Sequence, residues 1–170
     1  MVSLISLAAL TGPQELKPTV PSPRNIKSTD LPKLADLYLH AYGDGTSPPD
    51  AEKAADRISA AFEGVHGTPI PQASLLTADP EGRITAAIIT TERGLGTDGT
   101  RTAFIAELFT HPDHRRQGLA EKLLSHTLQA LHDTGHKTLA VTVNSANAAA
   151  IALYLSRDFR RLTPFAANDD

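Results

Sequence analysis

The chain lacks cysteine: none of its 170 residues is one. Disulfide bonds, thiolate nucleophiles and cysteine metal ligands are therefore excluded. The lack of cysteine suits a cytoplasmic protein, and we expect that location. Histidine occurs seven times, but the histidines share no helical face. His111 and His114 lie close together, but Pro112 separates them and no third ligand is evident. We therefore expect no metal site.

Long hydrophobic runs and a strong charge of either sign are also lacking. The apolar opening, residues 1–10, is too short to span a bilayer and has no positively charged region before it. The net charge of −3 argues against general nucleic-acid binding, which usually needs a basic surface. We therefore expect neither a membrane nor a nucleic acid as a partner.

The residues that are present have the proportions of one soluble domain. Hydrophobic residues make up 41% and charged residues 21% of the 170 positions, which is ordinary for a globular protein with a core. Four prolines make residues 11–24 an extended lead-in: Pro13, Pro18, Pro21 and Pro23. We therefore predict that residues 1–24 are an extended, proline-rich N-terminal extension that the core fold does not need. Its apolar tip can serve an interface, for example in a homodimer, and residues 25–170 form the single domain.

Start, stop and periodicity signals predict alternating helices and strands. The predicted helices lie between residues 30 and 43, between 50 and 64, at about 118–133, and at 147–157. The predicted strands are 73–78, 83–91, 101–110, 138–143 and 159–165. A helix between the strands 101–110 and 138–143 implies a right-handed parallel crossover. The hairpins around this unit imply a mixed sheet, so the predicted fold class is α/β (α+β).

Residues 111–120, with the sequence His-Pro-Asp-His-Arg-Arg-Gln-Gly-Leu-Ala, connect a predicted strand to a predicted helix. Gly118 lacks a Cβ atom, so a ligand can approach the main chain closely there. The first amides of a helix have no intrahelical acceptor and carry the positive end of its dipole. Arg115 and Arg116 add full charges, so this junction is suited to a phosphate group. Two arginines and a glycine before a helix are also typical of an ordinary solvated turn.

Three blocks of the chain, in order, resemble the GNAT acetyltransferase superfamily. Residues 26–34 are similar to the family's first strand and the start of its first helix. Residues 104–120 resemble its acetyl-CoA motif, with 115–120 matching the Gln/Arg-x-x-Gly-x-Gly/Ala loop. Residues 147–159 resemble its late Asn…Ala…Leu-Tyr…Gly-Phe block. The resemblance implies a mixed, centrally splayed sheet flanked by helices, and acetyl-CoA-dependent transfer of an acetyl group to a primary amine.

The chain departs from the family pattern at three positions. Asp158 stands where the family has a glycine before the last phenylalanine. Thr142 stands where members that acetylate N-termini have a glutamate on the preceding strand. Thr110 stands where an aliphatic residue usually precedes the phosphate loop. The acceptor, a small molecule or an amine of a peptide or protein, therefore stays unassigned.

Acetyl transfer needs two proton transfers, and these suggest catalytic residues. An alkyl ammonium, with a pKa of about 10, must lose a proton before it attacks, and the departing thiolate needs one. The resemblance implies that Tyr154 supplies this proton; the alternative is a half-buried helix tyrosine that only packs. Glu107, the one acid inside the central strand, can deprotonate the amine directly or through water, but a strand glutamate can equally face solvent. His111 is a weaker candidate for the base.

The resemblance also implies a set of residues that bind the cofactor. Main-chain groups at the end of the central strand would face acetyl-CoA, and the loop would hold its pyrophosphate. Asn147 would bond the pantetheine arm, cap its helix, or do both. The set comprises Leu108, Phe109, Thr110, Arg115, Arg116, Gln117, Gly118, Leu119, Ala120 and Asn147.

Two other classes of function stay open. One is a GNAT-fold acyl-CoA-binding or regulatory module without turnover, in which Tyr154 is incidental. The other is a phosphate-binding protein of unrelated fold. The glycine-rich residues 94–100 do not favour a nucleotide site, because they lack a Gly-Lys-Ser/Thr ending and a strand-to-helix junction. We interpret them as a turn.

Overall fold

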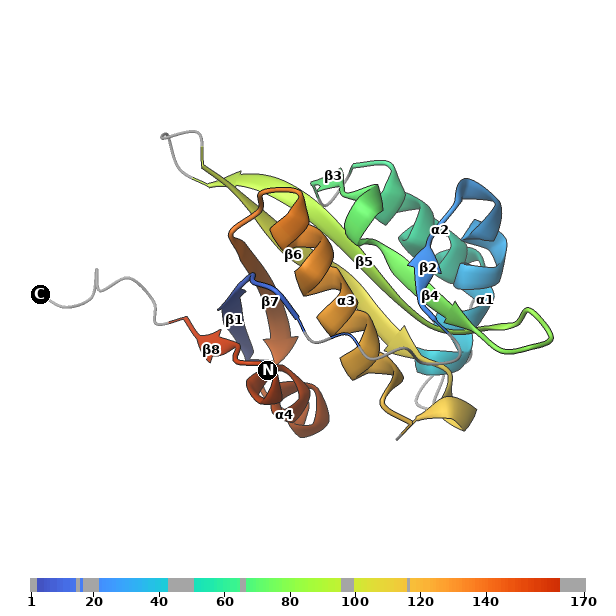
Figure 1. The fold of residues 1–170 in the computed structure, drawn as a ribbon. Helices are drawn as coiled ribbons and strands as arrows, with labels where there is room; N and C mark the ends of the chain where they lie inside the picture. Colours follow the sequence, from blue (N-terminus) through green and yellow to red (C-terminus); the bar gives the residue numbers. More distant parts are fainter. Residues whose placement is uncertain are drawn as a thin grey trace, which may run out of the picture.

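The computed structural model describes residues 3–14, 16, 22–42, 51–64, 67–95, 100–115 and 117–162. Within these residues one sheet has the strand order β2-β4-β5-β6-β7-β1-β8, with β3 beside β5 (Figure 1). The strands are β1 (Leu4–Leu10), β2 (Arg24–Asn25), β3 (Thr68–Pro69), β4 (Leu75–Ala78), β5 (Ile84–Leu95), β6 (Thr100–Thr110), β7 (Thr138–Asn144) and β8 (Arg160–Arg161). The β6–β7 pair is parallel and the other strand pairs are antiparallel. The predicted fold class, a mixed sheet flanked by helices, is confirmed.

Four α-helices in the described residues cover the sheet: α1 (Leu31–Tyr42), α2 (Ala51–Phe62), α3 (Leu119–Asp133) and α4 (Ala148–Ser156). Side chains alternate between the two faces of a strand, and β5 shows this directly. Ala86 and Ile88 belong to the core cluster beneath α3, whereas Ala87 and Ile89 belong to the cluster beneath α1 and α2. Because both faces are buried, β5 is apolar without interruption over this stretch.

The N-terminal residues lie in the sheet, where we had expected an extension outside the domain. β1 pairs with β7 from Leu4↔Asn144 to Leu10↔Thr138, and with β8 on its other side (Figure 1). Leu7 is 1% exposed and belongs to the core cluster beneath α3. The apolar run therefore forms a strand with one buried face, and the prolines that follow it do not mark a domain boundary.

The residues just after β1 contact the end of α3 and the turn that follows it, and the next described strand lies at the opposite edge of the sheet. The Thr11 amide donates to the Lys137 carbonyl at 2.9 Å, and the Gln14 amide donates to the Gln129 side chain of α3 at 2.8 Å. β2 at Arg24–Asn25 lies at that edge, next to β4. The family-like first strand predicted at the start of residues 26–34 is thus two residues long and ends just before that range.

Other element boundaries differ modestly from those predicted. β5 continues to Leu95, beyond the predicted end at residue 91, because its partner β6 starts at Thr100 and the two pair up to Leu95↔Thr100. β8 comprises Arg160–Arg161, and positions 163–165 of the predicted last strand lie outside the described residues.

Candidate active site

The central strands β6 and β7 pair over only a short length. Their parallel register contains Ala103↔Leu139 and Phe104↔Ala140. On its other edge β6 stays paired with β5 as far as Ala86↔Thr110. That pairing shifts register between Ile89 and Thr90, which places an extra residue on β6 immediately before Glu107. Such a bulge bends and twists its strand. β6 thus leaves β7 just before the end that carries most of the predicted site.

Glu107 lies on this separated part of β6. Its side chain is 10% exposed, and its Oε2 atom is 3.3 Å from Nε of Arg57 on α2. Arg57 is 59% exposed, so the partner of this carboxylate lies on its solvent side. Of the two orientations that the sequence left open, the structure therefore has the one in which Glu107 is shielded from solvent.

Tyr154, the predicted acid, is 4% exposed on α4 and packs against Phe159, with 5.2 Å between the ring centroids. Burial raises the pKa of the Tyr154 phenol, and the negative charge of Glu107 raises it further. The hydroxyl group is therefore protonated at neutral pH, and the negative charge of Glu107 opposes its loss of a proton.

Two further residues at this site were not identified from the sequence. Besides Arg57, Tyr38 of α1 lies near Glu107: burial and the Glu107 charge raise the pKa of Tyr38, and Arg57 opposes that shift. The Tyr38 ring packs edge-on against Phe109, with 5.5 Å between centroids. Helical periodicity places Tyr38 on the apolar face of its helix, but it does not indicate which strand residue it meets.

The predicted phosphate loop leads into α3 as expected. Gly118 is the N-cap of α3 with φ at 74°, and, its chain neighbours aside, no heavy atom of the described residues lies within 4 Å of the position that a Cβ would take. The backbone conformation favours glycine, and the space in front of it is open. Within the part of the chain that the structure describes, no side chain caps this helix, and buried Leu119 holds its N-terminal segment in the core. The first amides of α3 therefore face an open position and can accept an anion.

Arg115 is placed differently from the prediction. Its Nη2 donates at 2.8 Å to the carbonyl of Ala41, near the C-terminal end of α1. A cation at the C-terminal end of a helix also interacts favourably with the helix dipole. Arg115 therefore connects the loop to α1, and this contact uses at least one of the guanidinium nitrogens of Arg115. Arg116, the other predicted cation, lies outside the described residues.

The remaining predicted cofactor residues have mixed positions. Asn147 caps α4, because its side-chain oxygen accepts from the Ala150 amide at 3.1 Å, so the capping alternative is confirmed. Leu108 packs against the α3-side cluster, and Phe109 is buried in the α1–α2 cluster. At the end of β6, Thr110 is half-buried, as is Ala120 in α3, and Gln117 is exposed in the loop.

A family model decides the classification of this arrangement. The model of the acetyltransferase (GNAT) family matches residues 32–159. The chain belongs to the GNAT family. That range includes the strand parting, the phosphate loop, Glu107 and Tyr154.

Relatives of known name match this GNAT chain in part. The ribosomal protein bS18-alanine N-acetyltransferase of Escherichia coli K12 is 43% identical over 61 residues, which is 36% of this chain and 41% of that relative. The chain thus spans less than half of that protein. An L-amino acid N-acyltransferase of the same organism is 34% identical over 62 residues, 36% of each chain. The crystal structure of the E. coli S18-alanine enzyme matches with a TM-score of 0.62 and 27% identity, covering 84% of this chain and 79% of that one.

The departures from the GNAT pattern have structural counterparts. Asp158, in place of the family glycine, has φ at 66°, in the left-handed region that glycine prefers. It follows α4 in the turn that brings the Phe159 amide to the Tyr154 carbonyl, at 3.1 Å. Thr142, in place of a glutamate, is exposed on β7, and its hydroxyl lies 3.3 Å from that of Ser6 on β1.

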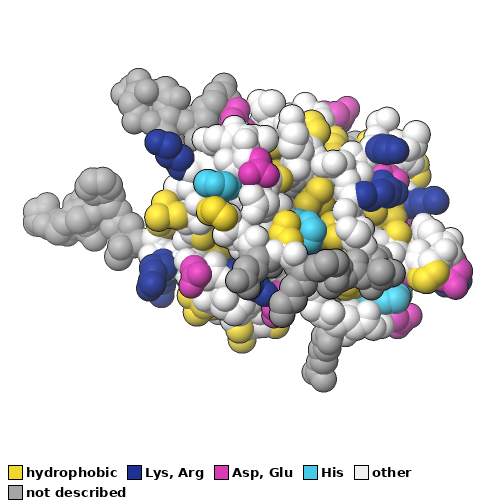
Figure 2. Space-filling model, viewed as in Figure 1, with side chains coloured by type: hydrophobic (Ala, Val, Ile, Leu, Met, Phe, Trp, Pro, Cys, Tyr) yellow, Lys and Arg dark blue, Asp and Glu magenta, His cyan; other side chains and the backbone are white. Residues whose placement is uncertain are grey.

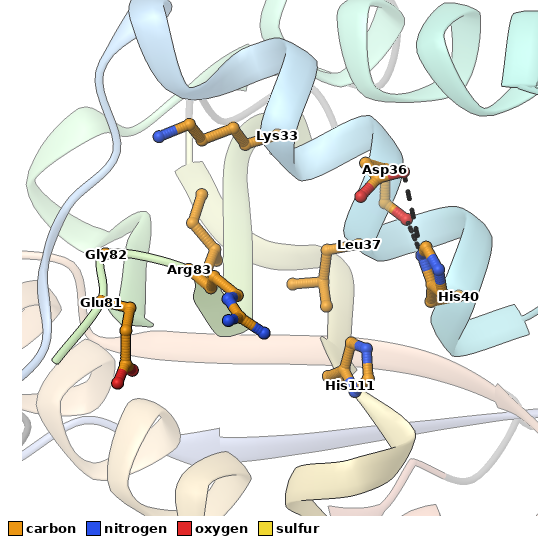
Figure 3. A pocket seen from close by; sticks show the side chains of 9 residues that line it. Lys33, Asp36, Leu37, His40, Glu81, Gly82, Arg83 and His111 are labelled. Atoms are coloured by element: carbon orange, nitrogen blue, oxygen red, sulfur yellow. Dashed lines mark hydrogen bonds and ion pairs between the residues drawn. The ribbon is translucent and has the colours of Figure 1, made fainter. Parts of the chain in front are cut away.

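A pocket of about 390 Å³ lies between α1 and the β4–β5 turn of this GNAT chain, with His111 among its lining residues (Figure 3). His111, where β6 ends, stacks on His40 of α1 with 5.5 Å between ring centroids. The Arg83 side chain reaches into the middle of the pocket. Its lining residues include two basic side chains, Lys33 and Arg83, and two acidic ones, Asp36 and Glu81. This balance favours no single class of ligand.

The described residues contain no helix long and apolar enough to cross a membrane. Across the same residues no group of His, Asp and Glu side chains is placed to hold a metal ion. On the face that carries α3, basic and acidic side chains of this GNAT chain are interspersed (Figure 2).

Proposed function

We propose that this protein transfers the acetyl group of acetyl-CoA to a primary amine, which attacks the thioester directly. The observation that carries the proposal is the shielded carboxylate of Glu107 on the part of β6 that has left β7, together with the buried phenol of Tyr154 on α4. This reaction requires a group that accepts a proton from the amine and a group that gives a proton to the thiolate. A carboxylate can do the first, and a protonated phenol can do the second.

The start of α3 is suited to the phosphates of the donor. Open space at Gly118, the uncapped first amides and the positive end of the helix dipole favour a pyrophosphate. Main-chain groups of residues 108–110 on β6, with Asn147 opposite, would border the pantetheine arm. Acetyl-CoA, when bound, supplies the activated acetyl thioester.

Glu107 and Tyr154 have complementary roles in this proposal. The Glu107 carboxylate accepts a proton from the acceptor ammonium, directly or through water, so that the amine nitrogen has a free electron pair. As the new C–N bond forms and the C–S bond breaks, the Tyr154 hydroxyl gives its proton to the sulfur. The nitrogen then loses its second proton, which restores the Tyr154 phenol through water, and Glu107 passes its proton to the solvent. The raised pKa of Tyr154 keeps that proton available at neutral pH.

The acceptor class follows from chemistry and from the named relatives. Arg57 already places a cation on Glu107, at 3.3 Å, which shows that this carboxylate accommodates a positively charged donor. The two named relatives act on an alanine of a ribosomal protein and on L-amino acids. We therefore place α-amines of amino acids and of peptides first among candidate acceptors.

A thiol-release assay tests the proposal. Acetyl-CoA is offered with amino acids, peptides beginning with alanine, and small alkyl amines. We expect amine-dependent release of CoA, and a decrease in kcat/KM of roughly 10²- to 10⁴-fold in Glu107→Gln, the size of a general-base contribution. Binding of acetyl-CoA without release with any amine would instead indicate a non-catalytic acyl-CoA-binding module. Tighter binding of ATP than of acetyl-CoA would indicate a different phosphate-binding protein.

A further inference from the structure

A second arginine, Arg157, lies beside the phosphate loop. It follows the end of α4, and its Nη2 donates at 2.8 Å to Oε2 of Glu121. Glu121 is in the first turn of α3, which begins after Gly118. The Glu121–Arg157 pair thus joins the end of the helix that carries Tyr154 to the start of the helix that the phosphates would approach.

The guanidinium group of Arg157 is only partly satisfied. Its Nε is buried and has no hydrogen-bond partner among the described residues. A buried donor without a partner is unfavourable, and a guanidinium has five N–H donors arranged for a carboxylate or a phosphate. The side chain is 36% exposed and that of Glu121 is 48% exposed, so a ligand can reach the pair. If the guanidinium turned towards a ligand, it would give up its hydrogen bond to Glu121.

Charge near the loop also favours a role for Arg157. Arg115 already donates to the Ala41 carbonyl near the end of α1. Glu121 places a negative charge where negatively charged phosphates would bind, and that charge repels them unless a cation offsets it. Arg157 is positioned to offset it and then to pair with a phosphate oxygen.

We propose that Arg157 binds a phosphate of coenzyme A, exchanging Glu121 for a phosphate oxygen when the cofactor binds. Arg157 is then a specificity-determining residue for donors that carry phosphates, and Glu121 is a positioning residue that holds it beside α3. The proposal rests on the proposed function, because it takes the start of α3 as the phosphate site.

Calorimetry with CoA on three single variants tests this assignment. In Arg157→Gln we expect the Kd for CoA to rise roughly 10- to 100-fold, as for loss of a hydrogen bond to a charged group. In Glu121→Gln we expect the Kd to fall, because the repelling charge is gone and the guanidinium is released. Arg160→Gln removes the same charge from exposed β8 and should change the Kd less than twofold. A purely structural ion pair would weaken binding in both Arg157→Gln and Glu121→Gln, so opposite signs separate the two explanations.

Truncated donors then locate the phosphate. We compare kcat/KM for acetyl-CoA with kcat/KM for acetyl-pantetheine, which has no phosphate. In Arg157→Gln the value for acetyl-CoA should fall, and the value for acetyl-pantetheine should stay the same. Dephospho-CoA lacks the 3′-phosphate. If Arg157→Gln weakens the binding of dephospho-CoA as much as that of CoA, Arg157 contacts the pyrophosphate. If Arg157→Gln leaves the binding of dephospho-CoA unchanged, Arg157 contacts the 3′-phosphate. An unchanged Kd for CoA in Arg157→Gln overturns the inference. Absence of CoA binding by the unmodified protein overturns the proposed function instead.

Discussion

The two edges of β6 differ in how they are paired. Towards β5, backbone pairing extends from Leu95↔Thr100 to Ala86↔Thr110. Towards β7, it is confined to Ala103↔Leu139 and Phe104↔Ala140. The β5 edge belongs to a continuous sheet with helices on both faces. The β7 edge leaves an end of β6 that carries Glu107 and faces the helix with Tyr154. The residues that we propose for the chemistry therefore lie where the sheet is least continuous.

The same comparison shows how the far part of the sheet is held. β7 obtains little pairing from β6, but it pairs along its whole length with β1 on its other edge. β1 in turn carries β8. The N-terminal strand thus provides for β7 the continuous edge that β5 provides for β6. Substitutions near the separation of β6 from β7 should consequently affect activity, whereas substitutions in β1 should affect stability.

The largest effect is expected where β6 separates from β7. Tyr154→Phe keeps the ring and removes only the hydroxyl, so kcat should fall roughly 10²- to 10⁴-fold while the melting temperature and the CoA affinity barely change. Rates are measured on an acceptor identified in the thiol-release assay. An unchanged rate in this variant would exclude Tyr154 as the acid and leave it as a packing residue.

The next largest effect is expected in β1. Leu7→Ala removes a side chain that is 1% exposed, and should lower the free energy of unfolding by about 2–5 kcal/mol in urea titrations. Leu10→Ala on the same strand is the matched control, because Leu10 is 79% exposed and its loss should cost less than about 0.5 kcal/mol. Removal of residues 1–10 should abolish cooperative unfolding. A truncated chain as stable as the full chain would instead support a dispensable extension.

A smaller effect is expected at the start of α3. Gly118→Ala forces a side chain into φ 74° and should cost about 1–2 kcal/mol of stability. It also places a methyl group in the open space before the helix, so CoA affinity should decrease. Gly135→Ala, at φ 87° beyond the other end of α3, is the control for backbone strain. It should lose similar stability and keep its CoA affinity. Equal affinity in both variants would place the phosphates elsewhere.

The smallest effect is expected at Asp158, in the turn after α4. Asp158→Gly relieves a left-handed backbone at φ 66° and should raise the free energy of unfolding by up to about 1 kcal/mol. Asp158→Ala should be less stable than Asp158→Gly, since alanine tolerates this conformation poorly. The two melting temperatures decide the outcome. If alanine is the more stable of the two, strain at this turn does not limit stability.

Local signals in the sequence predicted most of the fold. Gly118 and Gly135 delimit α3, and Asn147 begins α4, because caps and stops depend on neighbouring residues alone. β1 was not placed, because its partner is Asn144 at one end and Thr138 at the other, and nothing near Leu4 encodes that pairing. The prolines that follow β1 are typical of a linker, and they favoured an extension.

The candidate site was predictable to a similar degree. Tyr154 and Glu107 followed from a motif and from the lone acid in a strand. Arg57 did not, because a helix pattern shows that a residue is exposed but does not identify a strand carboxylate across the fold. The Arg115 bond to Ala41 likewise depends on how α1 packs, which no local pattern contains.

The position of β1 has a consequence for synthesis of the chain. Residues 4–10 leave the ribosome before all other elements of the sheet, yet β7, at Thr138–Asn144, is among the last to be made. At about 5–20 residues per second, β1 waits on the order of ten seconds for its partner. Contacts so distant along the chain also slow folding after release. During that interval the apolar strand is available to chaperones, and its late insertion closes the far side of the sheet.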